Sequence, residues 1–173
     1  MKNILISIIS IISILFADMI MPENGQSLQS IYILFEWEQE GDAIDYNLQI
    51  SDDDSFNNIL ADIEISTTIH IEKNIIDWNN DYYWRVRPIY IDNTYGNWVG
   101  QYMFNIKPSV LQNFDISIYN DTLIEDGLII FGQFAPELMI GLIDKFGNEI
   151  WNSGSADTDH QLGTLLNHVS KTG

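Results

Sequence analysis

Hydrophobic and polar residues alternate along much of the chain from residue 18 to residue 106. The first clear run places four apolar residues on one side of a strand: Ile31, Ile33, Phe35 and Trp37. A second run places four apolar residues inward and predicts a wet face opposite them: Ile44, Tyr46, Leu48 and Ile50 against Asp45, Asn47 and Gln49. Alternation of this kind is typical of strands in a sheet with one buried face.

Further short strands are predicted over residues 61–65, 67–71 and 98–106. Between them, a strand from Tyr82 to Arg87 points Tyr82, Trp84 and Val86 to one face and Tyr83, Arg85 and Arg87 to the other, with Pro88 after it. Turns rich in Gly, Asp and Asn separate these strands, and no helical period is sustained. About seven short strands at regular spacing predict a β-sandwich.

The pattern of apolar and turn residues changes after residue 106. A turn and apolar strand fill residues 123–132, a second apolar strand fills 139–144, and a turn over 145–148 leads into a strand at 149–151. Such a strand, turn and returning strand ending in Trp is the hairpin that β-propellers repeat. The expected division is a signal segment (1–17), a sandwich (18–106), a linker or connecting strand (107–122) and a partial propeller-like segment (123–173).

The N-terminus predicts export. Lys2 precedes an apolar run from Ile4 to Phe16, and the small residue Ala17 precedes Asp18. The run is shorter than the roughly 20 residues that span a bilayer, so it suits a cleavable signal peptide better than an uncleaved anchor. The expected location is extracytoplasmic, either periplasmic or secreted, with no membrane span after cleavage.

The composition of the chain limits the classes of molecule that it is expected to bind. The formal net charge is −18 at pH 7, which opposes binding to nucleic acid and to anionic membranes. The chain is 46% hydrophobic and 12% aromatic, which is enough to build a core. It has no cysteine, so disulfides, thiolate metal sites and cysteine nucleophiles are excluded. The Ile- and Asn-rich composition is typical of a bacterial protein.

Several of these stretches together resemble a fibronectin type III domain of the bacterial exported kind. They are Phe35-x-Trp37, Tyr46 to Ser51 with Phe56 after it, Tyr82 to Arg87, and Gly96-x-Trp98 followed by Phe104. The resemblance covers residues 22–106. It implies a seven-stranded sandwich with Trp37 and Trp84 in the core, and a strand-anchoring role for Tyr82.

A second resemblance covers the later hairpin. Asp126-Gly127 to Phe131, then Leu142-Ile143-Asp144-x-x-Gly147-Asn148-x-x-Trp151, is similar to the opening blade of bacterial arylsulfotransferase-type propellers. The resemblance implies an N-terminal sandwich followed by a propeller whose catalytic residues lie beyond Gly173. A lone hairpin is marginal in water. Residues 107–173 are therefore expected either to pack on the sandwich or, as the favoured interpretation, to begin a longer β-unit.

Candidate polar sites are few. Asp52, Asp53 and Asp54 are candidate calcium ligands, but a solvated turn is the favoured interpretation. His70 is expected to point away from the Ile69 and Ile71 face, as a surface or cross-strand residue rather than a metal ligand. In the tail, His160 and His168 with Asp157 and Asp159 are candidates for cation binding or nucleophilic chemistry, although loop positions are favoured.

Aromatic and cationic residues give two further candidates. Trp37 and Trp84 are expected in the core, whereas Trp78, with Trp98 and Trp151 as less favoured positions, is the best candidate for an exposed, sugar-stacking ring. Arg85 and Arg87 are candidates for binding an anionic ligand through bidentate hydrogen bonds, but pairing with cross-strand acids is the favoured interpretation.

The sequence contains no Ser-His-Asp motif, glycine-rich phosphate loop or HExxH motif. It therefore predicts no catalytic, cofactor-binding or metal-binding residue and no cofactor. We expect an all-β, exported, non-catalytic interaction or spacer module with a protein or glycan partner, from the N-terminal part of a larger protein. The alternative is the N-terminal fragment of an arylsulfotransferase-like enzyme that transfers sulfate between phenolic compounds.

Overall fold

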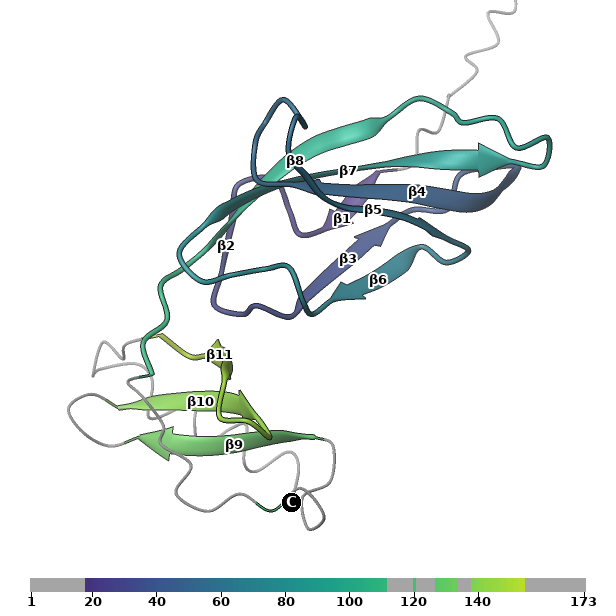
Figure 1. The fold of residues 1–173 in the computed structure, drawn as a ribbon. Helices are drawn as coiled ribbons and strands as arrows, with labels where there is room; N and C mark the ends of the chain where they lie inside the picture. Colours follow the sequence, from purple (N-terminus) through teal and green to yellow (C-terminus); the bar gives the residue numbers. More distant parts are fainter. Residues whose placement is uncertain (1–17, 112–119, 121–126, 134–137, 155–173) are drawn as a thin grey trace, which may run out of the picture.

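The protein is all-β in the computed structural model, which describes residues 18–111, 120, 127–133 and 138–154 (Figure 1). Within that part of the chain no helix is long and apolar enough to cross a membrane. The strands are β1 Met19–Met21, β2 Gln26–Leu28, β3 Ile33–Trp37, β4 Ala43–Ser51, β5 Ile59–Ile65, β6 Ile69–Glu72, β7 Asp81–Tyr90, β8 Val99–Ile106, β9 Leu128–Gln133, β10 Met139–Asp144 and β11 Glu149–Asn152.

Three sheets organise these strands. A 3-stranded sheet has the order β1-β3-β6, and a 5-stranded sheet has the order β2-β8-β7-β4-β5. These two sheets form the layers of the larger part of the molecule, and a 3-stranded sheet of order β11-β10-β9 lies at one end of it (Figure 1).

The main core lies between the first two sheets. Strict alternation on β3 turns Ile33, Phe35 and Trp37 inward, and the facing strand β7 contributes Trp84 and Val86. Trp37 is 1% exposed and Trp84 is fully buried, so the expected core positions of both rings are confirmed. Tyr82 is also buried, and its hydroxyl accepts a hydrogen bond from the backbone N–H of Asp77 at 2.8 Å.

The sandwich has eight strands in this structure and not the expected seven, because two short strands, β1 and β2, precede β3. β1 pairs antiparallel with β3 in the smaller sheet, whereas β2 pairs parallel with β8 in the larger one. The turn after Pro22 therefore carries the chain from one layer to the other, and each short segment completes a different sheet.

The strand expected to stop before Pro88 continues to Tyr90. The carbonyl of Pro88 accepts a hydrogen bond from the N–H of Gly96 at 2.9 Å. The N and O atoms of one residue point to the same side of a strand, so the missing N–H of Pro88 faces the 92–96 loop and not β4. The ladder between β4 and β7 is thus free to continue past the proline.

Two apolar positions differ from the expected parity. Ile44 is exposed because the pairing of β4 with β7 shifts between Ala43 and Asp45, which turns the first residues of β4 over. After Ser51, Phe56 is buried, whereas Ile59 is exposed at the start of β5.

The C-terminal sheet forms from the expected apolar segments. Strands β9, β10 and β11 are antiparallel neighbours, and the predicted turn lies between β10 and β11. One carboxylate oxygen of Asp144 accepts the N–H groups of Phe146 and Asn148, both at 2.8 Å, and Gly147 supplies a φ of 85°. Leu111, from the expected linker, packs with Met139 and Ile143 in a second small core.

Candidate functional site

The end of the sandwich is joined to the C-terminal sheet by paired backbone. The N–H of Ile31 donates to the carbonyl of Ile150 at 3.0 Å, and the N–H of Asn152 donates to the carbonyl of Gln29 at 3.1 Å. Ser30 and Trp151 form an antiparallel bridge between these bonds. The edge strand β11 therefore pairs with β10 on one side and with the sandwich on the other.

A buried polar network supports this junction. The side chain of Asn152 is fully buried; its Oδ1 accepts from Gln29 Nε2 at 3.1 Å and from the N–H of Gly154 at 2.8 Å, and its Nδ2 donates to Glu149 Oε1 at 2.6 Å. The other oxygen of Glu149 accepts from the N–H of Leu111 at 3.2 Å and from the hydroxyl of Ser109. Buried polar groups satisfied in this way fix one geometry, since any displacement leaves some of them unpaired.

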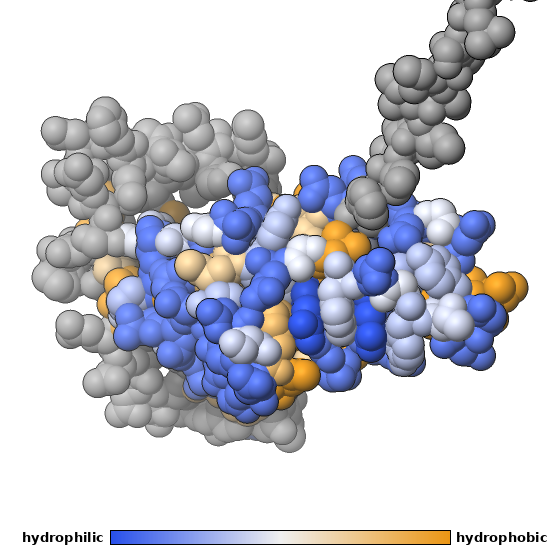
Figure 2. All heavy atoms as spheres, turned by 90° about the horizontal axis from the view of Figure 1, so that it is seen from above, coloured by the Kyte–Doolittle hydropathy of each residue, from blue (hydrophilic) through white to orange (hydrophobic). Residues whose placement is uncertain are grey.

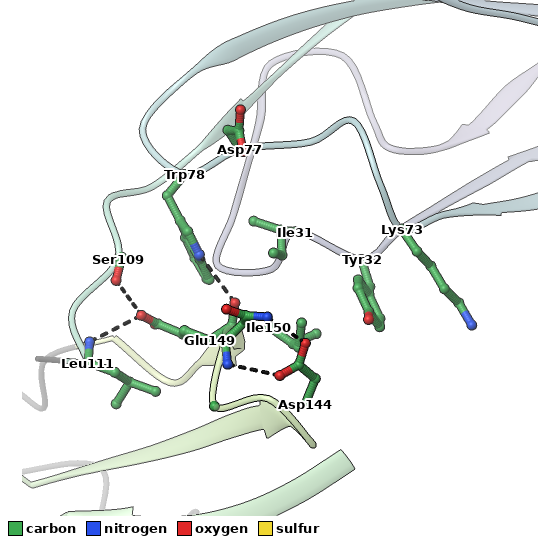
Figure 3. Close-up of a pocket in the computed structure, with 12 residues that line it drawn as sticks. Ile31, Tyr32, Lys73, Asp77, Trp78, Ser109, Leu111, Asp144, Glu149 and Ile150 are labelled. Atoms are coloured by element: carbon green, nitrogen blue, oxygen red, sulfur yellow. Dashed lines mark hydrogen bonds between the residues drawn. The ribbon is translucent and has the colours of Figure 1, made fainter. Parts of the chain in front are cut away.

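Trp78, predicted to be the exposed aromatic residue, lies half-buried at the junction instead. Its ring packs against the edge of the main core, and its Nε1 donates to the carbonyl of Glu149 at 3.3 Å (Figure 3). The ring of Trp78 is therefore half-buried and not fully exposed as expected, and the C-terminal sheet gives its indole N–H a partner.

A cleft of about 510 Å³ opens beside the junction. Figure 3 shows Tyr32 and Lys73 together, away from the Trp78 and Glu149 contact, and the ammonium of Lys73 lies 5.6 Å from the centre of the Tyr32 ring. The cleft is lined by residues from both units: Ile31, Tyr32, Lys73, Asp77, Trp78, Ser109, Leu111, Asp144, Gly147, Asn148, Glu149 and Ile150.

The acids of this cleft serve the structure around them. Asp144 accepts hydrogen bonds within its own turn, including Asn148 Nδ2 at 2.8 Å, and Glu149 is occupied by Leu111, Ser109 and Asn152. Among the described residues that line the cleft there is no histidine to activate a hydroxyl. The arrangement therefore suits joining two units.

The Asp52–Asp54 turn is closed by its own hydrogen bonds. Asp53 accepts from the N–H of Ser55 at 2.9 Å and from the N–H of Asn58 at 2.7 Å, and Asp52 accepts from the amide of Asn58. The hydrogen bond from Asn58 is the main cause that lowers the pKa of Asp53. Within the described residues, no group of three or more His, Asp or Glu side chains is arranged to hold a metal ion.

His70 lies on the opposite face of β6 from Ile69 and Ile71, as expected, and it is a cross-strand residue on the inner side. His70 pairs with Phe35 across β3 and β6 and faces the same side as that ring, whereas Ile69 and Ile71 point outward, with Ile71 53% exposed. His70 Nε2 lies 3.3 Å from a carboxylate oxygen of Glu72. The Ile, His, Ile alternation predicted the strand and separated its two faces, but it did not indicate that the isoleucines point outward.

Arg85 and Arg87 face outward, as predicted, but their favoured pairing with cross-strand acids is wrong. Each donates instead to the side-chain amide directly opposite it, Arg85 to Gln49 and Arg87 to Asn47. Asn47 and Gln49 are 3% and 6% exposed, so this face of β4 is covered and not wet. Trp98 covers it together with the arginines, and Trp151 is exposed on β11.

The remaining candidates, Asp157, Asp159, His160 and His168, lie outside the described residues, as does the turn expected before Gly127.

Comparison of the chain with family models, curated proteins and solved structures finds no match.

Proposed function

We propose that this chain is an exported, non-catalytic β-module in which the sandwich β1–β8 acts as a spacer that holds the sheet β9–β11 in a fixed orientation. The observation that carries the proposal is the paired backbone between residues 29–31 and β11. A flexible connection between the two units would need no such pairing. The buried Asn152, which bonds both to Gln29 and to Glu149, ties the same two units together a second time.

The surface of β9 supports an interaction role for the sheet that is held in this way. Ile129 and Ile130 are 51% and 73% exposed, although Phe131 on the same strand packs toward the small core. A strand that is apolar on both faces is typical of a sheet covered on both sides. We therefore expect a further β-unit of a larger exported protein to pack against this strand.

The alternative, an N-terminal fragment of an arylsulfotransferase-like enzyme, draws support from the three-stranded antiparallel sheet and its Asp144 to Gly147 turn. The non-catalytic proposal predicts no transfer of sulfate from p-nitrophenyl sulfate to phenol by the purified chain. Measurable transfer would favour the enzyme.

A distance measurement tests the spacer role. The chain has no cysteine, so Asn57→Cys and Ile130→Cys place one spin label on the sandwich and one on β9. We expect pulsed dipolar spectroscopy to give a single narrow distance distribution. A broad distribution in this parent chain would contradict a fixed orientation.

A matched pair of glycine variants identifies the junction as the cause. Gly154 has a φ of 75°, and a Cβ there would overlap the Gln29 amide, so Gly154→Ala is expected to broaden the distribution. Gly127→Ala adds the same methyl group where nothing lies within 4 Å and is expected to leave the distribution narrow.

A further inference from the structure

Two arginines and three aromatic rings form a stack on the outer face of the larger sheet. The Cζ of Arg85 lies 3.9 Å from the ring centre of Phe56 and 4.3 Å from that of Trp98. The Cζ of Arg87 lies 4.2 Å from the ring centre of Trp98 and 4.0 Å from that of Tyr95. Each guanidinium thus contacts two rings, and these contacts restrict the rotation of its plane.

Side-chain amides fix the inner edge of each guanidinium. Arg85 donates from Nε at 2.9 Å and from Nη2 at 2.7 Å to Gln49 Oε1, and Arg87 donates from Nε at 2.9 Å to Asn47 Oδ1. The amide nitrogens of Asn47 and Gln49 donate in turn to the two carboxylate oxygens of Asp62, at 2.6 and 3.0 Å.

This arrangement places neutral amides between the arginines and the carboxylate of Asp62. The chain has 25 Asp and Glu against 7 Lys and Arg, yet in the described residues neither arginine forms a salt bridge. A Glu at 49 or an Asp at 47 would pair with the guanidinium directly, as a charge-assisted bond that is stronger than a bond to an amide. The stack therefore keeps two cations available in a strongly acidic protein.

Within the described part of the chain, most N–H groups of the two guanidiniums form no hydrogen bond and remain for a ligand. Of the five N–H donors that an arginine has, Arg85 uses two and Arg87 uses one in these bonds. Burial, and after it the charge of Arg87, lowers the pKa of Arg85. The second cause is repulsion between the two cations, and a bound anion would relieve it.

We propose that Arg85 and Arg87 form a binding site for a small oxyanion group: a carboxylate, a sulfate or a phosphate. The rings and amides hold both guanidiniums in place before binding, so little side-chain entropy is lost when the anion arrives. β7 and β8 lie uppermost in Figure 1, and Figure 2 shows that the side seen from above is mostly hydrophilic with scattered apolar patches. The site is separate from the junction and goes beyond the spacer role.

The charge of the whole chain limits the ligand. At −18 the protein repels polyanions over distances set by the Debye length, about 8 Å at physiological ionic strength. A group with one or two charges makes the same bidentate contacts with much less repulsion. The site therefore fits a compact ligand with a single oxyanion, and it does not fit a polyanionic chain.

The test is an NMR titration of the whole chain labelled with 15N. Sodium acetate, sulfate and phosphate are added separately at constant ionic strength with chloride as the balancing anion, and the arginine Nε–H and tryptophan indole signals are followed. We expect saturable shifts of the Arg85, Arg87 and Trp98 signals with at least one oxyanion, and the three series show which geometry is preferred. Shifts no larger than those in chloride alone would overturn the proposal.

Two variants separate oxyanion recognition from general charge. Arg87→Lys keeps the positive charge and loses the planar fork, so we expect the dissociation constant to rise by about tenfold or more. Gln49→Glu combined with Asp62→Asn keeps the net charge but moves a carboxylate against Arg85, where it competes with the ligand. We expect this exchange to abolish saturable binding while the chain stays folded.

Unchanged affinity in the Gln49→Glu/Asp62→Asn chain would show that the arginine pair only fastens the 91–98 loop to the sheet and would overturn the proposal. That result would leave the spacer role intact, because the junction at Gln29 to Ile31 shares no residue with the stack.

Discussion

Trp84 and Trp37 lie beside one another in the core but differ in their hydrogen bonds. Their ring centres are 6.5 Å apart, and both side chains are almost fully buried. Trp84 Nε1 donates to the carbonyl of Pro22 at 3.3 Å, whereas Trp37 Nε1 has no partner among the described residues. The same substitution at the two positions therefore removes a satisfied donor in one case and an unsatisfied donor in the other.

We expect Trp84→Phe to lower the free energy of unfolding by about 1 kcal/mol more than Trp37→Phe. Both changes remove similar volume from the core, so the difference isolates the hydrogen bond to Pro22. Urea unfolding of the two variants measures it. Equal losses, or a larger loss at Trp37, would show that the indole bond contributes nothing to stability.

Gly100 is a second position where one residue decides stability. It lies in β8 with a φ of 70°, and a Cβ there would overlap the side chain of the buried Met19. We expect Gly100→Ala to cost about 1–3 kcal/mol, because it forces an L-residue into the left-handed region and displaces Met19.

The control is Gly41→Ala, which adds a methyl group where nothing lies within 4 Å and where no positive φ is required. Its expected effect is within about 0.5 kcal/mol. Thermal or urea unfolding of both variants makes the comparison, and a Gly100 variant as stable as the Gly41 variant would be inconsistent with the conformation of β8.

At the scale of the element, the sequence was enough to predict where strands form. It was not enough to predict which face of each strand is buried under other residues. Alternation on β3, β4 and β7 was enough to assign Phe35, Leu48 and Trp84 to the core. On β6 it separated His70 from the two isoleucines correctly, but it did not show that the isoleucines are the outward residues. Periodicity shows that two faces differ, but which face turns inward depends on the register with β3.

The arginine stack and the junction could not be predicted from the sequence for the same reason. The polar face of β4 looks wet in sequence, since Asn47 and Gln49 alternate with apolar residues, yet the structure buries both. The covering rings come from loop positions, Phe56 and Tyr95 among them, which lie near β4 and β7 only in the folded chain. The polar residues of the junction, such as Asn152, carry no sequence motif, and their pairing with Gln29 spans 123 positions.

The end of β6 gives a pH-dependent prediction. Glu72 is buried, which opposes ionisation, but hydrogen bonds from the N–H of Asn74, from His70 and from the N–H of Lys73 outweigh burial and lower its pKa below the ordinary 4.5. A depressed folded-state pKa contributes stability above the unfolded-state pKa, and this stability is lost as the pH falls through the folded-state pKa.

We therefore expect Glu72→Gln to destabilise the protein near neutral pH and to converge with the parent chain as the pH falls below 4.5 and through the lowered folded-state pKa. Chemical unfolding of both chains across this range gives the difference. Glu23→Gln, which removes the same charge at an exposed position, controls for a general charge effect. A difference between the Glu72 variant and the parent that persists unchanged into acid would contradict the role of ionised Glu72.

At the scale of the whole molecule, the export proposal predicts a mature protein with a defined N-terminal residue. We expect the chain recovered outside the cytoplasm of a bacterial host to begin at Asp18, because Ala17 is the small residue that precedes it after the apolar run. Mass spectrometry of the intact protein measures the N-terminus. Ala17→Leu is expected to slow processing, and a recovered parent protein that still begins at Met1 would favour the uncleaved anchor.

The central claim is that the sandwich holds the C-terminal sheet through paired backbone. Hydrogen exchange of the Ile31 and Asn152 amides in the full chain tests it most directly, because these two N–H groups donate across the junction. The account predicts that both amides are protected, that they open together, and that Gly154→Ala reduces their protection while Gly127→Ala does not. Exchange of both amides at the rate of an unprotected peptide in the parent chain would contradict it.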